Sequence, residues 1–111
     1  MSGITTHVLD TSRGRPAAGV PVVLERAVAS VWQPVGRGTT DADGRATDLL
    51  TSVPQDGRYR LTFDTGAYFR GAGEAGFYPE VSVTFVVASG EQHYHVPLLL
   101  SPFGYSTYRG S

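Results

Sequence analysis

Several residue types and patterns are missing from this chain of 111 residues. It has no cysteine, which excludes disulfides, thiolate zinc sites and thiol nucleophiles. It also has no lysine, so a Schiff-base lysine is excluded as a catalytic group. The formal charge of −1 gives no electrostatic reason to expect nucleic acid or a membrane as a partner. No apolar run reaches the roughly 18 residues of a membrane-spanning helix.

The first residues do not show a charged segment followed by an apolar one, the pattern of a secretory signal. We therefore expect a cytoplasmic protein. The length fits a single domain covering residues 1–111, with one hydrophobic core.

Turn-forming residues recur at short intervals and separate runs rich in β-branched and aromatic residues. This spacing is typical of an antiparallel sandwich of short strands. One short helix is expected at residues 65–70, where the alternation lapses before a Gly-rich loop. Strands are expected at residues 4–10, 20–28, 31–39, 45–49, 58–64, 80–88, 91–100 and 104–109.

Alternation assigns the two faces of the expected strand 91–100. One side is continuously apolar and consists of Tyr94, Val96, Leu98 and Leu100. If that side faces the core, His93, His95 and Pro97 point outward. The same reasoning turns His7 outward in the first strand. A partly apolar outer face that carries histidines indicates a cleft or a subunit interface.

His7, His93 and His95 are the only histidines of the chain. Each would serve as a general acid or base, because an imidazole pKa near ~6.5 suits proton transfer at neutral pH. A His-x-His pair with a third histidine is equally compatible with a three-histidine zinc site. The spacing leaves both options open.

Arg45 follows the segment Asp41-Ala-Asp-Gly44 and opens a short strand. It is either a solvated charge beside a hairpin or a fixed cation for an anionic substrate or developing oxyanion. The segment before it is similar to the start of a calcium loop. The carboxylates required further along are absent, so a tight glycine turn is expected instead.

Several stretches together resemble the 5-hydroxyisourate hydrolase family, the transthyretin-related proteins of urate breakdown. They are residues 6–11, 14–17, 40–45, 77–81 and 93–111. The last of these joins two histidines, an apolar run and a polar aromatic strand, whereas chain ends are usually polar and frayed. The closing Tyr-Arg-Gly-Ser is the most specific mark, because it distinguishes the enzymes from the hormone carriers of the same fold.

The resemblance implies an all-β, transthyretin-like (prealbumin-like) sandwich of two four-stranded sheets with one short helix. It also implies a homotetramer whose active sites lie at the dimer–dimer interface. By motif position, the catalytic residues are His7, Arg45 and His95. The substrate contacts are Tyr108, Ser111 and, with less support from the motif, His93.

The implied reaction opens the six-membered ring of 5-hydroxyisourate to give 2-oxo-4-hydroxy-4-carboxy-5-ureidoimidazoline, as a cyclic amidohydrolase without a metal or other cofactor. The two catalytic histidines suit the proton transfers and Arg45 suits the developing charge, but the sequence does not say which histidine is the base. The alternative is a non-catalytic, transthyretin-like protein that binds a small ligand in the same channel.

Overall fold

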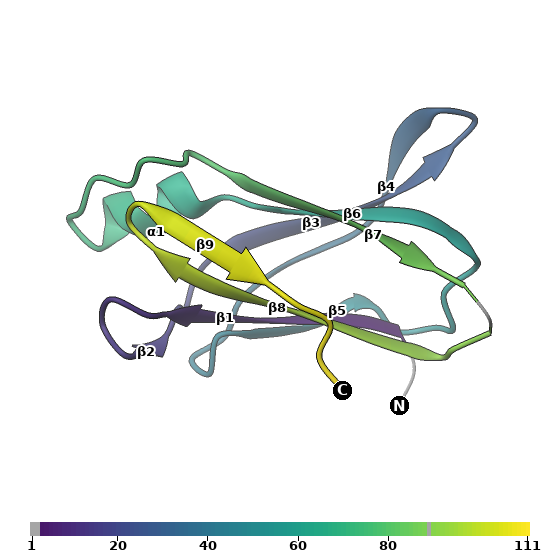
Figure 1. The fold of residues 1–111 in the computed structure, drawn as a ribbon, viewed down its shortest axis with the longest axis horizontal. Coiled ribbons are helices and arrows are strands. Elements are labelled where there is room, and N and C mark those ends of the chain that lie inside the picture. Colours follow the sequence, from purple (N-terminus) through teal and green to yellow (C-terminus); the bar gives the residue numbers. More distant parts are fainter. Residues whose placement is uncertain (1–2, 89) are drawn as a thin grey trace.

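The computed structural model describes residues 3–88 and 90–111, and in it two β-sheets pack face to face with one short helix at one end (Figure 1). The elements are β1 (Gly3–Asp10), β2 (Arg15–Pro16), β3 (Pro21–Val28), β4 (Val31–Thr39), β5 (Arg45–Leu50), β6 (Gly57–Phe63), α1 (Thr65–Gly71), β7 (Val81–Val87), β8 (His93–Ser101) and β9 (Gly104–Thr107). The expected sandwich with one helix is confirmed.

One sheet has the strand order β4-β3-β6-β7. In the other, β1 pairs with β8, β8 pairs with β9, and β5 pairs with the opposite edge of β1. The two-residue β2 continues that edge and lies outside the strands expected from the sequence. One pairing differs from the expected antiparallel arrangement, because β1 runs parallel to β8. Parallel neighbours need a long connection, and here the whole second sheet provides it.

Apolar residues of both sheets fill the space between them. The largest fully buried side chains include Ile4, Leu98 and Leu100 from one sheet and Leu61 and Phe63 from the other. The expected core side of β8 is confirmed, since Tyr94 and Val96 are only 4% and 6% exposed. This alternation leaves the histidines on the outer face.

Two short elements end at other residues than the sequence predicts: α1 begins at Thr65 as expected but runs one residue further, to Gly71, and β9 is shorter than expected. Helix α1 starts after Asp64, whose side chain accepts the Ala67 amide hydrogen bond at 3.0 Å as an N-cap. Strand β9 ends at Thr107, two residues earlier than expected. Pro97 lies on the neighbouring strand and has no N–H to donate, so regular pairing stops there. Among the described residues, no helix is long and apolar enough to cross a membrane.

Candidate active site

The outer face of the sheet that contains β1 carries a row of four residues, which lie side by side on β5, on β1, on β8 and just after β9. Arg45 lies opposite His7 across the β1–β5 pair, and His7 lies opposite Pro97 across the β1–β8 pair. The bridge between residues 95 and 110 extends the β8–β9 register, which places Tyr108 opposite Pro97. Residues opposite one another in a sheet lie about 5 Å apart. The pairing therefore brings a guanidinium, an imidazole and a phenol onto one surface.

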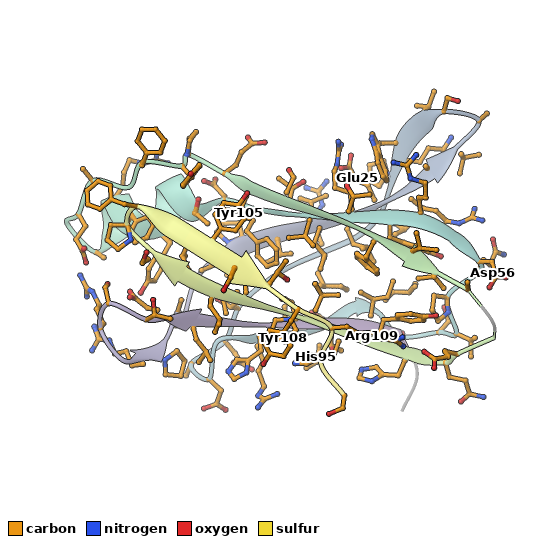
Figure 2. The ribbon with its side chains drawn as sticks, viewed as in Figure 1. Glu25, Asp56, His95, Tyr105, Tyr108 and Arg109 are labelled. Atoms are coloured by element: carbon orange, nitrogen blue, oxygen red, sulfur yellow. The ribbon has the colours of Figure 1, made fainter. Side chains whose placement is uncertain are left out.

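A second row lies two residues along the same strands, so its side chains share this outer face. Thr5 lies opposite His95, and His95 lies opposite Gly110. The Gly110 amide donates to the His95 carbonyl at 2.9 Å. Figure 2 shows His95 and Tyr108 where β9 passes into the C-terminal tail. The tail thus covers the strand that carries the second predicted catalytic histidine.

The hydroxyl of Thr5 contacts two imidazoles. Its Oγ1 lies 2.8 Å from Nδ1 of His95 and 3.2 Å from Nε2 of His93. The two rings are 6.4 Å apart between centroids and inclined by only 18°. All three side chains are at least partly buried, and Thr5 is 4% exposed. Because Nδ1 of His95 is engaged by Thr5, its Nε2 is the nitrogen available to a substrate.

The surroundings of His95 favour its neutral form. Partial burial lowers the His95 pKa below the usual 6.5, and the positive charges of Arg45, His7 and His93 lower it further. A hydrogen bond with the Thr5 backbone acts in the opposite direction but does not cancel these effects. A neutral imidazole at neutral pH is able to accept a proton, as a general base must.

Arg45 is placed by the turn before β5. The Asp41 carboxylate accepts the amide hydrogen bonds of Asp43 and Arg45 at 2.9 and 3.0 Å, and these bonds lower the Asp41 pKa. Gly44 has a φ of +77°, and a Cβ there would lie 2.4 Å from the Val8 carbonyl oxygen. The expected tight glycine turn is therefore confirmed.

The side chain of Arg45 lies at the end of that turn. Arg45 is exposed, and within residues 3–88 and 90–111 no hydrogen bond or ion pair engages its side chain. An unpaired cation beside His7 and His95 is free to bind an anionic group or a carbonyl oxygen that gains charge.

The predicted substrate contacts lie along the tail. Tyr108 is 56% exposed, and Ser111 is also exposed. His93 and Ser111 line an open groove of about 540 Å³ beside the end of β8. Arg109 lines the same groove, where its guanidinium stacks over the Tyr94 ring and pairs with Glu91. The tail thus presents two of its side chains toward the site and anchors itself with a third.

The zinc option for the three histidines gains no support from the geometry. Among the described residues, no group of three or more potential metal-ligating side chains is placed to hold an ion. His93 and His95 instead share the hydroxyl of Thr5. Sequence reasoning did not single out Thr5, although its position two residues before His7 gives it the same outward orientation.

Comparisons with known proteins show the family of the chain. The family model described as "HIUase/Transthyretin family" matches residues 4–110. The chain belongs to this family. The expected resemblance to the 5-hydroxyisourate hydrolases is also confirmed. The chain is 47% identical over 113 residues to the 5-hydroxyisourate hydrolase of Mus musculus, with 99% of this chain and 96% of the relative covered.

Solved structures of this HIUase/transthyretin family show both of its branches. The 5-hydroxyisourate hydrolase of Klebsiella pneumoniae is 41% identical to this chain with a TM-score of 0.88, and the match covers 100% of both chains. A sea bream transthyretin in complex with thyroxine is 35% identical with a TM-score of 0.90, covering 96% of this chain and 93% of the other. The backbone is therefore common to both branches, and the side chains of the outer face must distinguish the function.

Proposed function

We propose that the protein hydrolyses 5-hydroxyisourate to 2-oxo-4-hydroxy-4-carboxy-5-ureidoimidazoline in urate degradation. The observation that carries the proposal is the placement of His7, Arg45 and His95 on one outer sheet face, with an unpaired guanidinium beside two imidazoles. The similarity to hydrolases along the whole chain supports the choice of substrate.

Ring opening needs a proton acceptor for water and a proton donor for the departing nitrogen. Water forms a bond from its oxygen to a ring carbonyl carbon and gives a proton to Nε2 of His95, whose lowered pKa keeps it neutral. The ring C–N bond then breaks, and the proton that His95 took from water passes through His7 to the departing nitrogen, so both imidazoles end as they began. General acid–base catalysis of this kind contributes about 10²–10⁴-fold.

The attack also places negative charge on the carbonyl oxygen. Arg45 is the cation nearest in register to His7, and its side chain has no competing partner among the described residues. A positive group aimed at developing charge stabilises the transition state more than the substrate. Tyr108, Ser111 and His93 border the same face and are the proposed substrate contacts.

A carrier function is the second candidate, because the fold matches a thyroxine-bound transthyretin. A carrier would bind its ligand at the same face without chemistry. Two histidines and an unpaired arginine favour proton transfer and charge stabilisation over simple binding of an apolar ligand. A ligand bound without turnover would support the carrier.

We further propose a homotetramer with the sites at the dimer–dimer interface. Strands β7 and β9 are each paired on one side only within the described residues, and a groove of about 260 Å³ lies between them. Phe77, in the segment that leads into β7, is 70% exposed. Open strand edges with exposed apolar side chains favour pairing with a second copy.

The test of function follows freshly generated 5-hydroxyisourate by ultraviolet absorbance, with and without the protein. The substrate also decays spontaneously, so the measured quantity is the acceleration over that background. Saturable acceleration supports the hydrolase, and unchanged decay with measurable binding supports the carrier. For the assembly, light scattering of the intact protein and of a variant lacking residues 108–111 should give tetramers in both cases, with activity lost in the variant.

A further inference from the structure

The hydroxyl of Thr5 has only one proton to share between two ring nitrogens. His95 Nδ1 and His93 Nε2 both lie within hydrogen-bond distance of Oγ1, at 2.8 and 3.2 Å. A hydroxyl donates one hydrogen bond and accepts two. If both ring nitrogens were without a proton, one of them would face a lone pair. At least one of the two nitrogens must therefore carry its own proton, and the two histidines cannot choose their tautomers independently.

The role proposed for His95 decides which nitrogen carries the proton. A base that accepts a proton at Nε2 has no proton on Nε2 beforehand, so its neutral ring carries the proton on Nδ1. The nitrogen that faces Thr5 is Nδ1. A proton on Nδ1 leaves the hydroxyl proton of Thr5 free to point to His93 Nε2.

We propose that Thr5 is a positioning residue for the reaction: its hydroxyl holds His95 in the Nδ1–H tautomer and so leaves Nε2 as the proton acceptor. In the same arrangement, Thr5 donates its own proton to His93 Nε2. The catalytic part of this inference rests on the proposed function, whereas the tautomer can be observed without any substrate.

The arrangement is suited to proton transfer because it does not have to change during the step. When Nε2 takes a proton from water, Nδ1–H continues to donate to Thr5, so the ring keeps its orientation. The proton gained by His95 balances the one lost by water. A site that needs no reorganisation at the moment of reaction gains the full benefit of its oriented groups.

Three basic groups act on His95 from the surrounding strands: His7 on β1, Arg45 on β5 and His93 on β8. Their charges lower the His95 pKa and so shift the pH at which the ring gains its second proton. They do not replace the contact with Thr5, which is nearly completely buried and made at the opposite nitrogen.

Nuclear magnetic resonance of the ¹⁵N-labelled full chain tests the tautomer directly. Above the histidine titration range, the ring-nitrogen shifts of His95 should show a protonated Nδ1 and an unprotonated Nε2. Those of His93 should show an unprotonated Nε2. An Nε2–H tautomer of His95, or a mixture averaging both forms, would overturn the inference even if the protein hydrolyses 5-hydroxyisourate.

Three variants separate positioning from packing. Thr5→Val should mix the tautomers of His95 and lower kcat by about 10- to 100-fold with a smaller change in KM. Thr5→Ser should restore both properties. The matched control is Thr6→Val, because Thr6 is also buried but donates to the Val96 carbonyl in the core. The wild-type spectrum decides the tautomer should Thr5→Val not fold.

Comparison with Thr6→Val shows whether an effect of Thr5→Val is specific to the contact with the histidines. Loss of activity in Thr5→Val with unchanged tautomers, or an equal loss in Thr6→Val, would make Thr5 a structural residue and contradict the proposal. Absence of hydrolysis in the wild-type protein together with the expected ring shifts would contradict the proposed function while leaving the arrangement of the three side chains intact.

Discussion

Gly110 lies against the imidazole of His95. A Cβ at position 110 would sit 2.7 Å from Cδ2 of the ring, closer than such atoms approach in proteins. Together with the amide hydrogen bond to the His95 carbonyl, this contact holds the tail against strand β8. The tail therefore limits where the ring can lie, in addition to supplying Tyr108 and Ser111.

Replacing this glycine should disturb the site without unfolding the sandwich. In Gly110→Ala the methyl group must displace either the ring or the tail, and we expect a loss of about 10- to 100-fold in kcat/KM. Steady-state kinetics measures this effect. Gly71→Ala is the matched control, because nothing lies within 4 Å of a Cβ at that position. Equal activity of both variants would mean that the tail contact has no catalytic role.

Removing the cation should affect turnover far more than stability. Arg45 is exposed, so Arg45→Ala should keep the free energy of unfolding, whereas kcat/KM should fall by about 10²–10³-fold. Arg37→Ala removes an exposed arginine from β4 in the other sheet and serves as the control. The comparison requires both kinetics and urea unfolding. Normal turnover by Arg45→Ala would contradict the charge-stabilising role.

The pH dependence follows from the lowered pKa of His95. If neutral His95 is the base, kcat/KM should rise with pH and reach half of its plateau below 6.5. The free energy of unfolding should change with pH in the same direction as kcat/KM. A folded pKa below the unfolded value means that the unfolded chain binds more protons, so stability is lost as the pH falls from about 6.5 through the folded pKa. His95→Asn should remove both effects, and a midpoint above 6.5 would disagree with the assignment.

Stability should depend on a separate carboxylate at the far end of β1. Asp10 is 1% exposed and accepts hydrogen bonds from the Tyr68 hydroxyl at 2.6 Å and from Ser12 and Arg13. Burial alone would raise the Asp10 pKa, but these bonds outweigh it and lower the value, while the pKa of Tyr68 is raised to about 12.

We expect Asp10→Asn to lower the free energy of unfolding by about 1–3 kcal/mol, because one buried hydrogen-bond partner is lost. The activity of the folded fraction should not change. Urea unfolding measures the loss, and Asp56→Asn is the control at an exposed loop position, labelled in Figure 2. A loss of the same size in the control would mean that the hydrogen bonds of Asp10 contribute nothing specific.

Local patterns were sufficient to predict most of the elements. Alternation located β8 and its core side, and the lapse in alternation located α1. The parallel pairing of β1 with β8 was not predictable in this way, because the choice of a distant partner strand leaves no local signal. The early end of β9 depends on Pro97 of the neighbouring strand and therefore on the same long-range register.

The site was predictable in its residue types but not in its connections. Alternation placed His7 and His95 outward, and the family motif added Arg45. The bridge from Thr5 to two imidazoles depends on side-chain distances across β1 and β8, which a sequence does not contain. Pro97 also proved to be buried although it was expected to face outward, since the tail with Gly110 lies over it.

The central claim is that the outer-face histidines carry out the hydrolysis. The most direct test compares 5-hydroxyisourate turnover by the wild-type protein and by His95→Asn, after both have been shown to be folded and equally assembled. We predict a loss of at least about 10²-fold in kcat/KM for the variant, the lower end of what general acid–base catalysis contributes. Turnover by His95→Asn equal to that of the wild type would contradict the account.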